Sequence, residues 1–257
     1  MLGAGPLFDF NGAALSPRVE RFRLVDANPL CVDHWKHLDK PVEPVITDIT
    51  NSLGDWLRHL ETATGSWSEV LSEIRTLSLT PKQGYVPVTD SLLSLNILSQ
   101  LEVGWQESIE PLLKKRFGGR FVHQHEQEWL QAIRPSSRVL AEQHLVALEA
   151  SRAVDILLIT DAEYVDYTGR KYSVNKWEAP PLTWSEKGWK ADAAVEFEVT
   201  PALEGLVIDR DSLNRWMPSY QVQWRESWLW HISPYGTEPI DHGQLHRVVA
   251  LSLRLVK

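Results

Sequence analysis

The sequence predicts an α/β domain in which a mostly parallel sheet carries helices on both faces and ends in an antiparallel strand pair. Short apolar runs alternate with longer amphipathic stretches over most of the chain, which is the pattern of β-α-β units. Several of these runs end in an acidic residue, and open α/β sheets bind ligands at this carboxyl edge. Two apolar runs around a turn containing Pro and Gly close the chain, as expected of an antiparallel pair.

The composition limits the classes to which the protein can belong. Its 257 residues, 43% of them hydrophobic, can bury a substantial core, and we interpret residues 1–257 as one domain. The formal net charge of −8 argues against nucleic-acid and anionic-membrane partners. Cys31 is the only cysteine, so no internal disulfide and no cysteine-based metal cage is expected. No apolar run reaches the roughly 18–20 residues of a membrane span and the start lacks a signal pattern, which predicts a cytoplasmic protein.

In the first half, two apolar runs each lead to an acid, Asp26 and Asp48. Apolar residues three and four apart predict amphipathic helices after the second run, and Ser66 with Glu69 completes a capping box for one of them. The predicted elements are a strand at 21–26, a short helix at 31–40, a strand at 42–50, and helices at 52–62 and 66–79.

In the second half, a buried strand runs into polar residues at Asn96, and a later strand ends in Asp161. A segment rich in Pro and Trp has no periodicity, which indicates a loop or lid. The predicted elements are strands at 90–101 and 154–164, a helical region at 105–151 with breaks at Gly118-Gly119 and near Pro135, a lid or insertion at about 165–225, and final strands at 228–232 and 248–255.

Four landmarks occur in order: "LGAGPL", "LVDANP", "ITDIT" and "DSLLSLNILSQL". With the closing strand pair, they make the chain resemble the class I S-adenosylmethionine-dependent methyltransferases, which have a Rossmann-like sheet. More narrowly, it resembles uncharacterised bacterial methyltransferase-like proteins whose glycine loop continues into "PL-x-D", for which "PLFDF" is the counterpart here.

The resemblance implies S-adenosylmethionine as cofactor and a set of residues that bind it. Gly3 and Gly5 would let the backbone approach the methionine part without a side-chain clash. An acid at the end of the second strand, Asp26, would accept hydrogen bonds from the ribose hydroxyls. The remaining implied contacts are Asp48 with the adenine amino group, Ile49 with the ring face, and Asn96 beside the sulfonium.

On the acceptor side, Asp161, Tyr164 and His231 are the candidate substrate-binding residues. Methyl transfer is an in-line displacement, and holding the acceptor in line supplies much of the acceleration. No catalytic residue is therefore assigned, and the acceptor is expected to be a small molecule or a protein side chain. The alternative is a protein that keeps the fold and binds S-adenosylmethionine, or acts as a scaffold, without turnover.

The sequence also departs from the family pattern. No acid precedes the glycine loop, and "NILSQ" replaces the Asn-Pro-Pro-Tyr type of sequence, which argues against DNA base methylation. Because the strand before the loop should be central, we expect either that the chain begins one strand late or that another segment fills this position. His123 and His125 are two residues apart, so they cannot share a helix face, although on a strand they could form a partial metal site. We interpret them as surface histidines, and no metal site is predicted.

Overall fold

The computed structural model describes residues 1–4, 19–80, 82–168, 181–193, 195–203, 206, 210–233 and 242–256. The strands are β1 (Phe22–Asp26), β2 (Val42–Ile46), β3 (Ser91–Leu95), β4 (Asp155–Thr168), β5 (Leu182–Ser185), β6 (Gly188–Ala191), β7 (Glu196–Pro201), β8 (Tyr220–Ser233) and β9 (His242–Leu255). The helices are the 3₁₀ turn η2 (Pro29–Cys31), α2 (Val32–Trp35), α3 (Leu53–Thr62), α4 (Trp67–Ser78), α5 (Ile97–Phe117), α6 (Gly119–Gln124), α7 (Glu126–Ile133), α8 (Pro135–Ser151) and α9 (Arg210–Trp216).

The first residues of the chain connect two halves of the sheet. Leu2 forms parallel bridges with Val25 of β1 and Ser94 of β3. Backbone hydrogen bonds run from Leu2 N to Leu93 O at 2.7 Å and from Val25 N to Met1 O at 2.9 Å. Residues 1–4 therefore fill the position between β1 and β3, and they give the order β2–β1–Leu2–β3–β4–β9–β8.

The sheet is mixed. β1 pairs with β2, and β3 with β4, in parallel. β9 is antiparallel to both β4 and β8, and β7 is antiparallel to β4. The α/β class and the C-terminal antiparallel pair are thus confirmed, whereas the predicted mostly parallel sheet is too simple a description. The sheet is mixed because β4 pairs in antiparallel with both β7 and β9. β8 and β9, 14 residues each, are also longer than the five-residue and eight-residue runs visible as apolar sequence.

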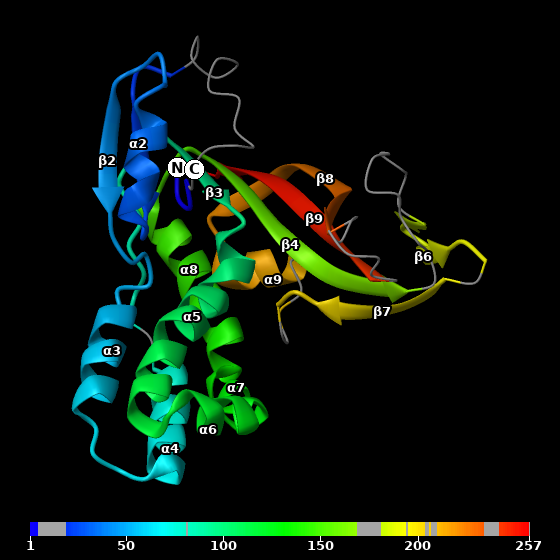
Figure 1. The fold of residues 1–257 in the computed structure, drawn as a ribbon. Helices are drawn as coiled ribbons and strands as arrows, with labels where there is room; N and C mark the ends of the chain where they lie inside the picture. Colours follow the sequence, from blue (N-terminus) through cyan, green and yellow to red (C-terminus); the bar gives the residue numbers. More distant parts are fainter. Residues whose placement is uncertain are drawn as a thin grey trace.

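Helices cover both faces of the sheet at β1. Phe22 and Leu24 pack with Cys31 and Trp35 on the side of α2, while Val25 points into the main core on the opposite side. Successive strand residues point to opposite faces, so a strand covered on both sides is apolar almost throughout. Figure 1 shows α2 beside β2 and the group from α3 to α8 below the strands.

The helical region after β3 is confirmed with both predicted interruptions, because α5 ends before Gly118 and α8 begins at Pro135. The helix starts earlier than predicted, at Ile97. Asn96 adopts a left-handed conformation with φ 51°, which turns the strand into the helix within one residue. The capping box of Ser66 and Glu69 is also present at the start of α4.

β4 continues past the acid at which it was expected to end. A register shift lies between Asp161 and Glu163, after which β4 pairs with β9 as far as Thr168. β3 stops at Leu95, and β7 takes the edge of β4 that is left open, beginning with the pair Glu163 and Pro201. Apolar periodicity could not predict this extension, because the second half of β4 is stabilised by pairing with β7 and β9, which are distant in the sequence.

The segment predicted as a lid contains regular structure. Within residues 181–193, β5 and β6 form an antiparallel hairpin, and β7 extends the sheet. The Pro- and Trp-rich stretch is therefore partly a hairpin, held by Leu182 in a small core with Val165 and Leu245. Residues 169–180 of the predicted lid and the turn at 234–241 lie outside the described residues. Along the described ranges, no helix combines the length and the apolar character needed to cross a membrane.

Candidate functional site

The carboxyl edge of the parallel strands brings several of the predicted residues together. Gly3 follows the bridge residue Leu2, Asp26 ends β1, and Asn96 directly follows β3. Gly5 lies outside the described residues. Because Leu2 pairs with Val25 and with Ser94, Gly3 is adjacent to the ends of both β1 and β3.

Gly3 occupies a position that excludes side chains. Its φ is +64°, and a Cβ placed there would lie 2.6 Å from Cγ1 of Ile97 and 2.9 Å from the carbonyl oxygen of Leu95. A left-handed conformation combined with close packing explains why glycine stands here. The backbone can therefore turn tightly over the first residue of α5.

The carboxylate of Asp26 is held over the turn that follows β1. Its Oδ1 accepts a hydrogen bond from the backbone N–H of Asn28 at 2.8 Å. The side chain of Asn28 in turn accepts from Leu30 N and caps the 3₁₀ turn. Thr47 N donates to the carbonyl oxygen of Asp26 at 2.9 Å, which joins the ends of β1 and β2. Asp26 is half-buried, and its orientation is set by its own loop.

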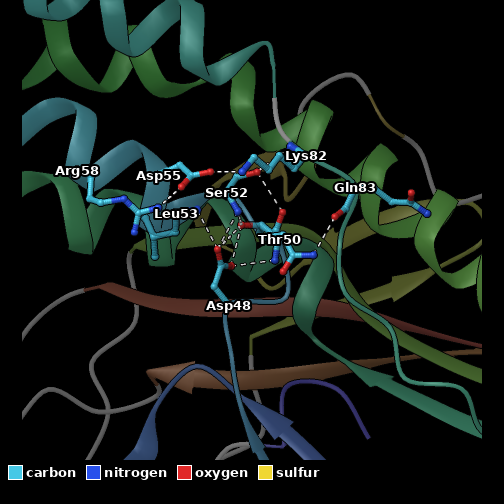
Figure 2. A network of polar contacts seen from close by, with 9 residues as sticks. Asp48, Thr50, Ser52, Leu53, Asp55, Arg58, Lys82 and Gln83 are labelled. Atoms are coloured by element: carbon cyan, nitrogen blue, oxygen red, sulfur yellow. Dashed lines mark hydrogen bonds and ion pairs between the residues drawn. The ribbon is translucent and has the colours of Figure 1, made fainter.

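Asp48 is turned toward its own loop (Figure 2). Its Oδ1 accepts from the backbone N–H and the hydroxyl of Thr50 at 2.8 and 2.7 Å, and its Oδ2 accepts from the backbone N–H groups of Ser52 and Leu53 at 3.0 and 2.8 Å. A carboxylate has about four lone-pair sites, so these contacts use its accepting capacity. Asp48 therefore secures the start of α3, and its predicted bond to an adenine amino group would need this network to rearrange.

Ile49, predicted to lie against the adenine ring, belongs to the main hydrophobic core and is 8% exposed. Its carbonyl oxygen accepts from Tyr85 N at 2.6 Å. The structure thus buries the Ile49 side chain among protein side chains.

Asn96 carries an unusual polar atom. Its backbone N–H donates to the carbonyl oxygen of Ile159 at 2.8 Å, which fixes the residue between the ends of β3 and β4. Its Oδ1 is buried and has no hydrogen-bond partner within the described part of the chain. An unpaired buried acceptor costs on the order of 1–3 kcal/mol, so such an atom in a sheet-edge position suits a ligand that donates or carries positive charge.

A second polar cluster surrounds Asp161. Only 1% of Asp161 is exposed, and its Oδ2 accepts from the hydroxyl of Ser99 at 2.8 Å while its Oδ1 lies 3.2 Å from Nδ1 of His246. The Tyr164 ring lies 4.5 Å from the His246 ring, centroid to centroid. Burial, followed by the negative charge of Asp161, raises the pKa of Tyr164 to about 12, so its phenol stays protonated.

Ser99 and His246 were not among the predicted site residues. Ser99 lies three residues after Asn96, in the first turn of α5, which is a weak sequence signal. His246 faces Tyr164 only because of the antiparallel register between β4 and β9. Tyr164 and His246 are more than 80 residues apart, and no local pattern in the sequence predicts the register that pairs them.

The structure does not bring His231 to this cluster. Trp230 is paired with His246, so the next residue along β8, His231, points to the other face of the sheet. There its Nε2 lies 2.6 Å from the hydroxyl of Tyr167, and burial lowers the pKa of the imidazole. A Cβ on Gly243 would lie 2.3 Å from that hydroxyl, which explains the glycine between them.

Within the described ranges, no group of three or more His, Cys, Asp and Glu side chains could hold a metal ion. His123 is largely exposed, and His125 stacks on Phe121 with ring centroids 4.0 Å apart. No protein-family model matches the chain, and no curated protein matches it.

Proposed function

We propose that the chain binds S-adenosylmethionine at the carboxyl edge of its sheet and transfers the methyl group to a small-molecule or protein acceptor. The observation that supports this most is the strand order. The chain passes from residues 1–4 outward through β1 to β2, then returns to β3 on the other side and continues to β4. In a Rossmann-like sheet, such a reversal marks the crevice where nucleotide ligands bind.

Three residues at this reversal have the properties the cofactor needs. Gly3 makes the tight turn over the first residue of α5, Asp26 offers a carboxylate at a strand end, and Asn96 offers a buried oxygen that has no partner among the described residues. Asp48 and Ile49 fit less well, because the first is engaged by its own loop and the second lies in the core. S-adenosylmethionine supplies a methyl group on a positively charged sulfur.

The contribution of the protein is to orient the acceptor. The buried pair of Asp161 and His246 holds Ser99 and Tyr164 close to the end of β3, since the hydroxyl of Ser99 also lies 3.3 Å from the carbonyl oxygen of Asn96. A protonated Tyr164 can donate to an acceptor molecule and keep it in place. Positioning of this kind is sufficient to accelerate a displacement whose leaving group is already good.

Replacement of Asp26 by Ala tests the cofactor site. We expect it to weaken the binding of S-adenosylmethionine by about 1–3 kcal/mol, because a buried hydroxyl donor of the ligand would lose its acceptor. Isothermal titration calorimetry with S-adenosylmethionine and with its demethylated product measures this directly.

The matched control is Asp33→Ala, which removes an exposed carboxylate on α2 that pairs with Lys36. This variant should bind the cofactor as the natural sequence does. Equal affinity of the Asp26 variant and the natural sequence would remove Asp26 from the site, and absence of binding by the natural sequence would refute the proposal. Binding without any demethylated product in a broad acceptor screen would favour the non-catalytic alternative.

A further inference from the structure

A cavity of about 380 Å³ opens where β3 leaves the edge of β4 and β7 replaces it. It lies between the first turns of α5, the helices α7 and α8, and the end of β7. Ligand pockets range from about 300 to 1,000 Å³, so the cavity has the size expected for a small molecule. Its position next to Asn96 connects it with the proposed methyl-transfer site, because Ser99 lines it.

Apolar atoms form more of the lining surface than polar atoms do, and most of the polar side chains in it are uncharged. Hydroxyl and amide groups predominate, from Ser99, Ser137, Tyr164, Gln106, Gln127 and Gln131. One carboxylate and one guanidinium, those of Glu102 and Arg134, complete the charged part of the lining. Nε2 of Gln106 donates to Oε1 of Glu102 at 2.9 Å, which orients both side chains.

This chemistry favours a ligand that combines apolar surface with uncharged polar groups over one that is wholly apolar or strongly charged. An apolar molecule would cover amide groups without replacing the hydrogen bonds that they make to water, which is unfavourable. The lining has one positive and one negative side chain, so its net charge is zero and it does not neutralise a ligand that carries a full net charge. Amide groups both donate and accept, so they match a neutral or zwitterionic molecule that does the same.

Two residues, Asp161 and His246, contact the side chains of Ser99 and Tyr164 that form the inner wall of the cavity. Asp161 accepts from Ser99 at 2.8 Å and contacts His246 at 3.2 Å, and the His246 ring packs against Tyr164. Asp161 and His246 are therefore positioning residues for two of the lining hydroxyl groups, those of Ser99 and Tyr164. A fixed donor at the wall lowers the entropic cost of binding a polar ligand.

We propose that this cavity binds a small polar molecule without net charge, which pairs through amide or hydroxyl groups with Gln127 and Gln131 at the rim and with Tyr164 at the wall. Its role as the site of the methyl acceptor rests on the proposed function. The binding of such a molecule does not depend on the proposed function, and it can be measured in the absence of cofactor.

Three probes of nearly equal size separate the ligand classes: benzamide, which is neutral, benzoate, which is an anion, and benzylamine, which is a cation. We expect the full chain to bind benzamide about fivefold or more tightly than either charged probe, as measured by ligand-observed saturation-transfer NMR titration. The double variant Gln127→Leu with Gln131→Leu should weaken benzamide binding about tenfold. Both side chains are exposed on α7, so this variant is expected to fold.

The matched control is Gln124→Leu, because Gln124 is an exposed glutamine on α6 that does not line the cavity. It should bind benzamide as the natural sequence does. Equal binding of the three probes, no binding of benzamide, or an unchanged affinity in the double variant would overturn the proposal. Calorimetry with S-adenosylmethionine on the same samples separates the two ideas. Benzamide binding without cofactor binding would leave the cavity site intact and refute the methyl-transfer function.

Discussion

Among single residues, His144 is a titratable group whose pKa is changed by burial in the core. It lies on α8, is 3% exposed, and its Nε2 is 2.9 Å from the hydroxyl of Ser94 on β3. Burial lowers the pKa of this imidazole from 6.5 to about 4, so the neutral ring is the form that the fold accommodates. The contact links the helical layer to the sheet through a hydrogen bond between His144 and Ser94.

The stability of the protein should therefore depend on pH through His144. Below about pH 6.5 the His144 imidazole binds a proton in the unfolded chain, whereas in the folded chain it stays neutral down to about pH 4. Lowering the pH through this range therefore favours unfolding. The free energy of unfolding should fall by about 3 kcal/mol across this window, and the full contribution should be present above it. Urea unfolding of the natural sequence and of His144→Gln, at several pH values, measures the difference in slope.

The His144→Gln variant should lose this part of the pH dependence, because glutamine can still pair with Ser94 but does not titrate. His123→Gln is the control, since the side chain of His123 is 82% exposed. It should keep the slope of the natural sequence. Identical slopes for the natural sequence and the His144 variant would contradict the assignment.

Among the elements, α3 depends on a carboxylate that lies outside it. Oxygen atoms of Asp48 accept from the backbone N–H groups of Ser52 and Leu53, which have no partners inside the helix. The hydroxyl of Ser52 accepts from Lys82 N at 2.7 Å, so the same network fixes the segment that leads toward β3 (Figure 2). A negative charge at the start of a helix adds a favourable interaction with the helix dipole.

Replacement of Asp48 by Ala should lower the free energy of unfolding by about 1–3 kcal/mol, because the loop donors of Asp48 lose their acceptor. Chemical denaturation measures this, and calorimetry with S-adenosylmethionine on the same variant tests the predicted adenine contact. Asp55→Ala is the control at the same helix, since Asp55 forms exposed ion pairs with Arg58 and Lys82. A loss in the control as large as in the Asp48 variant would contradict the capping role.

For the whole molecule, β4 is the strand at which the parallel part of the sheet meets the antiparallel part. Its first five residues pair with β3 on one side and β9 on the other, and its later residues pair with β7 and β9. β8 pairs only with β9 among the described strands and so has an open edge. Figure 1 shows β4 and β9 extending together from the helical layer.

This arrangement predicts a gradient of local stability that hydrogen exchange can measure. Amide protons of Ile156 and Leu158 should exchange only when the molecule unfolds globally, since their strand is paired on both sides. The slowest amides of β8 should exchange about hundredfold faster, because an edge strand can open locally. Equal protection in β4 and β8 would contradict the central role of β4.

Local patterns in the sequence were sufficient for most of the elements. Apolar periodicity located the helices after β2 and after β3, and the glycine pair and proline marked the breaks at Gly118 and Pro135. The capping box at Ser66 was also readable, since its residues are three apart. The predicted lengths of β4, β8 and β9 were too short, because pairing with distant segments extends these strands.

The candidate site divides in the same way. The sequence placed Gly3, Asp26 and Asn96 at strand ends, because a strand end is a local property. It could not show that Asp48 turns back on its own loop, since which hydrogen bonds a carboxylate makes depends on the path of the loop.

The sequence by itself determined where the parallel strands begin and which acids follow them, because these properties depend on residues close together in the chain. Only the tertiary structure decided that residues 1–4 connect the two halves of the sheet, that His231 points away from Tyr164, and that His246 supports Tyr164. Each of these depends on the register between strands far apart in sequence, and a shift of one residue would reverse the face on which every side chain lies.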